Sequence, residues 1–280
     1  MRIKITSDST CDLSQDLLNQ HDIALSLLTV VKDGQEFTDG LTITPADIFA
    51  HVASGGGLCS TAALGVGVYQ DFFAKFAQQY DGVIHISIGS GFSSSYQNAS
   101  LAAEEFSNVR VIDSMNLSTG QGLVVLKACQ LAQEYEDLDA LQAALQEFTT
   151  RVEASFVLDR LDYMVKGGRC SAAAALGANL LNLKPCIEVK DGKMVVVKKY
   201  RGTYSRCLAS YVKDRLCNRD DLDNDTLFLT YTPVSDECLT AVKNSIKEYG
   251  HFTNNYETTA GCTVSCHCGP GTLGVLFVRK

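Results

Sequence analysis

The sequence predicts an α/β fold of two domains, an N-terminal Rossmann-like domain with a parallel sheet and a C-terminal α/β domain with a mixed or antiparallel sheet. The order strand, polar loop and helix recurs at residues 3–18, 83–106 and 109–134, which is typical of helices that cover a parallel sheet. A predicted hairpin and several short strands follow residue 154. A length of 280 residues also suits about two domains. We expect domains at 1–153 and 154–280.

The first domain should begin with a strand at residues 3–6 and a helix that starts near Asp12, where Asp12 and Gln15 could form a capping box. Residues 23–31 are apolar enough for one strand, and Asp33-Gly34 then supplies a hairpin turn.

A helix start is predicted at Thr44, because Thr is a good N-cap, Pro45 suits the first helical position and Asp47 adds an acid to the first turn. The other elements expected in this domain are helices at 68–80, 120–134 and 138–152, and strands at 83–88 and 109–112.

The second domain should contain a hairpin at 186–200 with Asp191-Gly192 at its turn. The other elements expected here are strands at 226–232, 255–259, 262–266 and 272–278, and helices at 204–216 and 235–249.

Composition narrows the class of protein. The net charge of -8 argues against a nucleic-acid partner, which needs clustered positive charge. No apolar run approaches the length of a membrane span, and the first residues carry no secretory signal. The 11 cysteines are therefore expected to be reduced thiols in a cytoplasmic protein.

The loop after the apolar run 83–88 is the clearest candidate binding element. Residues 89–95 contain two glycines and four serines, and a helix pattern follows them. Free backbone N–H groups, hydroxyl groups and the helix dipole favour an anion at such a position. The loop has no lysine or arginine, so a carboxylate fits it better than a triphosphate. The alternative is a flexible turn that only caps the helix.

Two further segments allow a functional and a structural interpretation. Gly167-Gly168 should end a helix and hold Arg169 in a fixed place beyond it, although this motif by itself favours a surface arginine. The small apolar residues at 172–183 could form the wall of a long cavity or pack in a core.

The cluster Cys262, Cys266, His267 and Cys268 suggests zinc, but a strand would place His267 on the opposite face from Cys266 and Cys268, so no metal site is expected. The bend at 269–271 leaves His267 beside a loop, where it could meet a ligand or be satisfied locally by backbone.

Together these segments resemble the DegV family of bacterial fatty-acid-binding proteins along nearly the whole chain. The segments that carry the resemblance are Asp8-Ser9-Thr10-Cys11-Asp12-Leu13, Ser60-Thr61, Ser90-Gly91-Phe92-Ser93-Ser94-Ser95-Tyr96-Gln97, Asp113-Ser114, Gly120-Gln121-Gly122, Gly167-Gly168-Arg169 and His267-Cys268-Gly269-Pro270-Gly271.

The resemblance implies one long-chain fatty acid in a buried tunnel between the domains. It implies that Thr61 and Ser93 bind the carboxylate, with Arg169 and His267 near the head group in support of phosphoryl transfer. Ser60 stays an alternative to Thr61, because Ser60-Thr61-Ala62-Ala63 swaps the family's hydroxyl residues and lacks its proline. Loops around the pocket would supply Asp8, Ser9, Ser90, Gly91, Ser114 and Gly269.

The resemblance also implies a non-catalytic carrier with no metal or cofactor besides its fatty-acid ligand. Its partner would be a separate ATP-dependent fatty acid kinase that forms an acyl phosphate, and transient contact with a membrane surface is compatible with this role. The alternative function is a small-molecule transferase or hydrolase that uses the crevice at 90–95 with His267 as general acid or base.

Overall fold

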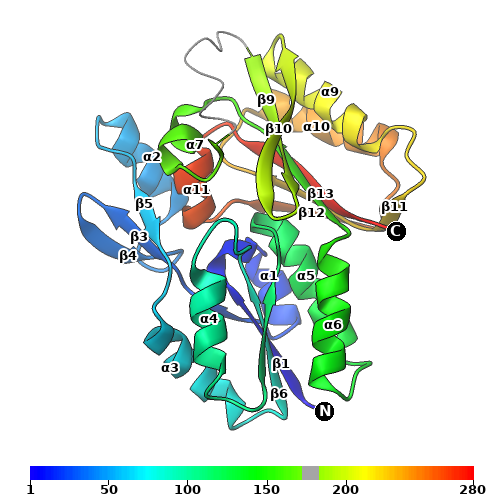
Figure 1. Ribbon diagram of the computed structural model, residues 1–280. Helices are drawn as coiled ribbons and strands as arrows, with labels where there is room; N and C mark the ends of the chain where they lie inside the picture. Colours follow the sequence, from blue (N-terminus) through cyan, green and yellow to red (C-terminus); the bar gives the residue numbers. More distant parts are fainter. Residues whose placement is uncertain (172–182) are drawn as a thin grey trace.

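The computed structural model describes residues 1–171 and 183–280 and confirms the predicted α/β fold (Figure 1). The N-terminal half is built on a parallel sheet of order β2-β1-β6-β7. Its strands are β1 (Ile3–Asp8), β2 (Ala24–Ser26), β6 (Gly82–Ser87) and β7 (Val109–Asp113). Every residue of β6 is buried, as expected of a central strand with both faces covered.

Helices cover both faces of this sheet (Figure 1). Aromatic residues of α3, chiefly Tyr69 and Phe73, form one core with α4 and strands β6 and β7. Apolar residues of α1, α5 and α6 form the core on the other face. The bounds of these helices are α1 (Gln15–Gln20), α3 (Val66–Ala77), α4 (Ser95–Ala103), α5 (Ser118–Leu131) and α6 (Leu138–Thr149).

The second sheet has the order β10-β9-β8-β13-β11-β12 and is mixed as predicted, because β11 and β12 are parallel and the other pairs are antiparallel. Its strands are β8 (Val152–Val157), β9 (Leu183–Lys190), β10 (Lys193–Arg201), β11 (Leu222–Tyr231), β12 (Asn254–Thr259) and β13 (Leu273–Arg279). Residue 153 lies inside β8, and the domain boundary after it stays a prediction.

The two faces of this second sheet have different partners. One face packs against α9 (Tyr204–Leu216) and α10 (Asp236–Tyr249). The other face contributes Phe156, Phe228 and Leu276 to the same core as Val124 of α5. The two halves are therefore joined by shared apolar packing.

A third, small antiparallel sheet of order β4-β3-β5 lies beside this contact. It consists of β3 (Thr29–Lys32), β4 (Gln35–Thr38) and β5 (Ser60–Ala62), and short helices lie near it (Figure 1). These helices are α2 (Pro45–Ala53), α7 (Asp162–Gly167) and α11 (Cys262–Cys268). The predicted capping box of Thr44 and Asp47 is present at the start of α2.

The single strand predicted at 23–31 is wrong. The segment is divided into β2 and β3, which belong to different sheets. Between them the N–H of Leu28 donates to Oγ of Ser9 at 3.2 Å instead of joining a strand ladder. The side chain of Ser9 thus helps to end one strand and redirect the chain toward the other sheet.

The strand predicted at 262–266 is also wrong, because this segment is helix α11. Asp39 accepts hydrogen bonds from the N–H groups of Cys262 and Thr263 and from Oγ1 of Thr263, which satisfies the first turn of a helix. The strand argument against zinc therefore fails. Within residues 1–171 and 183–280, however, no group of three or more His, Cys, Asp or Glu side chains could hold a metal ion.

The capping box predicted for Asp12 and Gln15 does not form. Helix α1 begins at Gln15 after the N-cap Ser14, whose Oγ accepts a hydrogen bond from the N–H of Leu17. Asp12 ends the short helix η1 (Ser9–Cys11), and its side chain is directed elsewhere.

Most of the predicted cavity or core segment at 172–183 lies outside the described residues. Among the helices that the structure does describe, none has the length and apolar character needed to cross a membrane.

Candidate head-group site and acyl cavity

Four of the predicted site residues line one cavity. Thr61 comes from β5, Ser93 from the loop before α4, Arg169 from the segment after α7 and His267 from α11. The structure therefore brings together side chains that are far apart in the sequence. We call this space the head cavity.

His267 is the centre of the polar contacts in the head cavity. Its Nε2 lies 2.8 Å from Oγ1 of Thr61. Burial of the ring, with a smaller effect from the charge of Arg169, lowers the pKa of His267 to about 4. The imidazole is therefore neutral near pH 7. A side chain at position 167 would stand 2.4 Å from Nδ1 of His267, so Gly167 leaves the room that the ring needs.

Arg169 is the sole charged side chain among the described residues that line the head cavity. Gly168 ends α7 with a φ of 68°, a left-handed exit as predicted. The guanidinium then donates to the carbonyl oxygen of Gly167 at 2.8 Å and to that of Phe92 at 3.4 Å. These bonds hold an exposed positive charge at the cavity.

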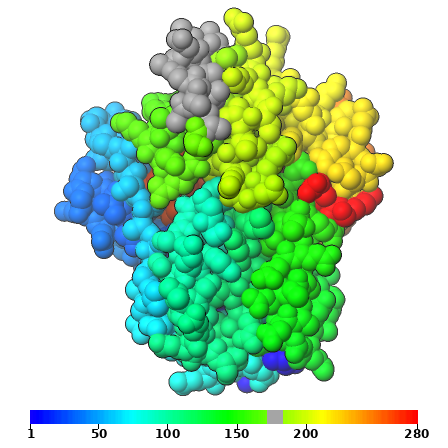
Figure 2. Space-filling model, viewed as in Figure 1, coloured from blue at the N-terminus to red at the C-terminus, as the bar shows by residue number. Residues whose placement is uncertain are grey.

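Ser93 lies in the loop between β6 and α4, two residues before the helix begins. Its Oγ accepts from the N–H of Ser95 at 3.1 Å and lies 2.9 Å from Oγ of Ser95. In the same loop, Ser90 and Gly91 are exposed. A side chain at Gly91 would meet the carbonyl oxygen of Gly192 at 2.2 Å, so the tip of the β9–β10 hairpin rests on this loop (Figure 2).

Strand alternation in β5 separates the two hydroxyl candidates. Thr61 and Ala63 line the head cavity, whereas Ser60 is exposed on the strand. Successive strand residues point to opposite faces, so the geometry favours Thr61 over Ser60 as the residue that meets a ligand.

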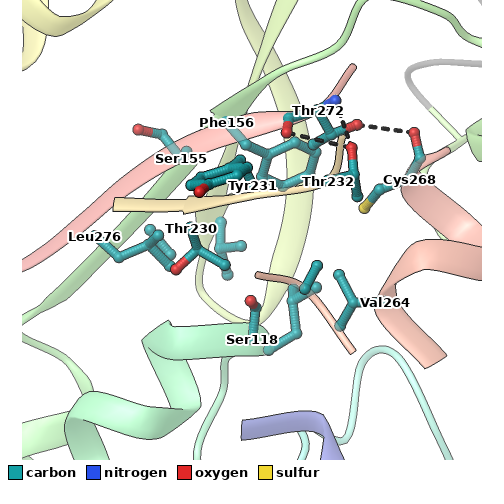
Figure 3. A pocket seen from close by; sticks show the side chains of 15 residues that line it. Ser118, Ser155, Phe156, Thr230, Tyr231, Thr232, Val264, Cys268, Thr272 and Leu276 are labelled. Carbon is teal, nitrogen blue, oxygen red and sulfur yellow. Dashed lines mark hydrogen bonds between the residues drawn. The ribbon is translucent and has the colours of Figure 1, made fainter. Parts of the chain in front are cut away.

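A second cavity, whose lining residues are drawn in Figure 3, shares part of its wall with the first. Leu117, Val264 and Cys268 line both cavities, and we call these three residues the neck. The second cavity, which we call the tail cavity, has walls from both halves of the protein, including Ala154, Phe156 and Leu276 of the second sheet.

The tail cavity also has hydroxyl-bearing residues in its wall, but their hydroxyl groups have other partners. Thr230 is bonded to Thr119 at 2.6 Å, and Oγ1 of Thr272 donates to the carbonyl oxygen of Cys268 at 2.9 Å (Figure 3). The same holds for Ser118, Ser155, Tyr231 and Thr232. Because these hydroxyl groups are already hydrogen-bonded, the wall of the tail cavity is mainly apolar.

Asp8 is not among the residues that line either cavity, although its partner Ile88 lines the head cavity. Its buried carboxylate accepts hydrogen bonds from Tyr69, Ser26, Ser87 and the N–H of Ile88. Burial acts to raise the pKa of Asp8, but the bond and charge of His85, with the bonds of Tyr69 and Ser87, hold it below its usual range.

The remaining predicted loop residues, Ser9, Ser114 and Gly269, make their contacts outside the head cavity. Ser9 donates to Asp39, and Ser114 donates to the carbonyl oxygen of Asn116. Gly269 has a φ of 72° and packs against the ring of Tyr163, where a side chain would stand 2.6 Å from the ring. None of these three is among the residues found to line the head cavity.

The neck residues were missed by the sequence interpretation. Val264 and Cys268 are four residues apart on α11, and His267 lies between them, so one helical face presents all three to the cavities. A helical interpretation of 262–268 would have revealed this face. Leu117 gives no comparable local signal.

Comparison with known proteins places this arrangement in a family. Residues 2–280 match the sequence model described as "Uncharacterised protein, DegV family". A DegV domain-containing protein of Clostridium acetobutylicum is 32% identical over 284 residues, which cover 100% of this chain and 99% of that protein.

Two solved structures are similar over nearly the whole chain. A DegV family protein from Thermus thermophilus, described by its fatty acid binding, is 27% identical with a TM-score of 0.91 and 100% coverage of both chains. A stearic acid-binding protein from Eubacterium ventriosum is 26% identical with a TM-score of 0.85, covering 99% of this chain and 98% of that one. The chain described above belongs to the DegV family.

Proposed function

We propose that this protein binds one long-chain fatty acid, with the carboxylate in the head cavity and the acyl chain passing the neck into the tail cavity. The observation that carries the proposal is that Leu117, Val264 and Cys268 line two cavities at once. One of these cavities holds Thr61, Ser93, Arg169 and His267, and the other has hydroxyl groups that are bonded elsewhere. The fatty acid binding of the Thermus thermophilus relative supports the same function.

The chemistry of the two cavities suits the two ends of such a ligand. An acyl chain of about 16 carbons gains on the order of 12 kcal/mol from burial at ~0.8 kcal/mol per methylene, and ordering and association offset a large share. The carboxylate needs hydrogen-bond donors when it leaves water. In the tautomer that carries its proton on Nε2, His267 donates to Thr61 and leaves the Thr61 hydroxyl proton for the carboxylate.

The protein would then act as a carrier that presents the carboxylate to a separate ATP-dependent kinase. Arg169 is exposed and yet held at the head cavity, so its charge would offset the negative charge that develops during phosphoryl transfer. Such a carrier would work in the cytoplasm and would itself be non-catalytic.

Organic extraction of the purified native protein, followed by mass spectrometry, tests the binding step. The expected result is about one long-chain fatty acid per chain, and its loss from a Thr61→Val/Ser93→Ala double variant. The matched control is Ser60→Ala, which removes a neighbouring but exposed hydroxyl. A native protein that is empty and takes up no added fatty acid would overturn the proposal.

The enzyme alternative has its own discriminating measurement. A carrier should neither hydrolyse generic esters nor consume ATP when assayed alone. Ester turnover that disappears on substitution of His267 would instead support a hydrolase or transferase at residues 90–95.

A further inference from the structure

The motif Asp8-Ser9-Thr10-Cys11-Asp12-Leu13 supplies no lining residue to the head cavity. It packs instead against α5, which follows the neck residue Leu117. Oγ1 of Thr10 donates to Oε1 of Gln121 at 2.8 Å. A side chain at Gly122 would stand 2.8 Å from the carbonyl oxygen of Cys11, so backbone and helix are in close contact here.

Asp12 extends this contact across the two halves of the protein. Its Oδ2 accepts a hydrogen bond from Oγ of Ser118 at 2.6 Å. Its Oδ1 accepts one from the N–H of Gly261 at 2.9 Å. Ser118 is the first residue of α5 in the N-terminal half, whereas Gly261 is the N-cap of α11 in the C-terminal half. One carboxylate therefore ties the starts of two helices together.

Of the two partners of Asp12, Ser118 lines the tail cavity and Gly261 is next to a residue that lines it. Ser118 lines the tail cavity and directly follows Leu117 of the neck (Figure 3). Gly261 directly follows Ala260, another lining residue of the tail cavity. It also precedes the helix that carries Val264 and Cys268. The carboxylate of Asp12 thus connects the segment at 117–118 to the segment at 260–264, and both segments contribute to the wall of the tail cavity.

The backbone at this contact is unusual on both sides. Asp12 has a φ of 49° and Ser118 a φ of 52°, in the left-handed region that residues with a side chain rarely adopt. Such conformations persist where the surrounding structure fixes them, and they occur often at functional positions. Burial also raises the pKa of Asp12 to about 7, with the Ser118 and Gly261 bonds offsetting part of the effect. Burying the Asp12 carboxylate on this strained backbone therefore lowers the stability of the fold, which indicates a purpose other than stability.

We propose that Asp12 is a positioning residue for the acyl chain, which sets the width of the neck and tail cavity by holding Ser118 and Gly261 at a fixed separation. This inference rests on the proposed fatty-acid binding and adds to it the control of chain fit. Asp12 touches neither the carboxylate site nor, through its own atoms, the acyl chain. It acts through the residues beside its two hydrogen-bond partners.

The role predicts an effect that depends on chain length. Delipidated protein is titrated with octanoic, dodecanoic, hexadecanoic and octadecanoic acid, and the dissociation constants are compared. In the unaltered protein, each added methylene that is buried should raise affinity by roughly fourfold. In Asp12→Ala the gain per methylene should fall below about twofold for the longer chains, while octanoic acid binding changes less than twofold.

Two further variants keep the test informative. Asp12→Asn retains an acceptor for Gly261 but places an NH₂ group opposite Ser118, so it should fold well and give an intermediate slope even where Asp12→Ala does not fold. Ser118→Ala should give the same intermediate gain in affinity per methylene as Asp12→Asn. The double variant Asp12→Asn/Ser118→Ala should lower that gain no further. Ser14→Ala is the matched control, since it removes a capping hydroxyl two residues away without a contact to Ser118 or Gly261.

The outcomes separate this inference from the proposed function. Equal loss of affinity at every chain length, or unchanged affinity at every length in both Asp12 variants, would overturn the positioning role while leaving fatty-acid binding intact. Failure of the unaltered protein to bind any fatty acid would overturn the proposed function itself.

Discussion

Oγ1 of Thr61 lies 2.8 Å from Nε2 of His267, although 206 positions separate the two residues in the sequence. Thr61 belongs to the small sheet and His267 to helix α11 of the C-terminal half. The contact places a hydroxyl and a neutral imidazole in the head cavity, which shares three lining residues with the tail cavity.

Removal of the two hydroxyl groups at the head cavity should weaken fatty-acid binding. A hydrogen bond to a charged group contributes about 1.5–3 kcal/mol, so Thr61→Val and Ser93→Ala should each cost roughly tenfold to a hundredfold in affinity. Isothermal titration with a long-chain fatty acid measures this loss. Ser60→Ala, whose hydroxyl is exposed on the other strand face, should stay within about twofold of the unaltered protein.

Arg169→Ala should separate binding from phosphoryl transfer. The guanidinium donates to backbone carbonyl groups at the mouth of the head cavity, so its charge is expected to act mainly on the developing phosphate. With a fatty acid kinase and ATP supplied, we expect acyl-phosphate formation to fall by at least about tenfold and fatty-acid retention by much less. Equal losses in the two assays would show that Arg169 serves only to bind the ligand.

His267 should give the protein a measurable pH dependence of stability. Its pKa is lowered from 6.5 to about 4 on folding, so the unfolded chain takes up the proton first as the pH falls. Its contribution is therefore complete above pH 6.5 and is lost between pH 6.5 and 4, on the order of 3 kcal/mol in total.

The His267→Gln variant isolates this contribution, because glutamine keeps a polar group near Thr61 and does not titrate. Free energies of unfolding from urea titrations of both proteins should diverge with the pH. The difference in favour of the unaltered protein should shrink as the pH falls from 6.5 to 4. A difference that stays constant over this range would show that the buried imidazole does not have the lowered pKa.

Asp8 should matter for stability and not for chain preference. Its buried carboxylate accepts four hydrogen bonds in the core of the N-terminal half. Asp8→Asn replaces an acceptor by a donor and should cost about 3–5 kcal/mol, whereas Tyr69→Phe removes one bond and should cost about 1.5–3 kcal/mol. Chemical denaturation measures both. A shift in the ratio of affinities for long and short fatty acids would instead assign Asp8 to the binding site.

The parallel sheet could be predicted because short stretches of neighbouring residues indicate most of its strands. Strands β1, β6 and β7 are each a short apolar run followed by a polar loop, and their alternation with helices indicates the fold class. Helix α11 was not predictable in this way, since the group that starts it is Asp39, 223 positions earlier in the sequence. The local pattern of Cys262 to Cys266 suggested a strand, and a distant carboxylate overrode it.

In the candidate site, too, the parts with a local sequence pattern could be predicted and the parts assembled by long-range packing could not. Thr61, Ser93, Arg169 and His267 could be named from short motifs that resemble a family. The tail cavity could not, because its walls are assembled from α5, β8, β11 and β13 and depend on how two sheets pack. Asp12 is the intermediate case, since its motif was visible but its partners are 106 and 249 positions away.

The shared walls of the tail cavity make any lipid within it a component of the apolar core. Phe156 and Leu276 on one side and Val124 on the other belong to one buried cluster, so a bound chain would adhere to both halves at once. Binding of this kind stabilises the folded state by mass action. Limited proteolysis of the stripped and the loaded protein tests this coupling, with faster cleavage expected when the lipid is absent. A cell short of fatty acid would then lose its carrier faster, and the carrier's lifetime would report the lipid supply.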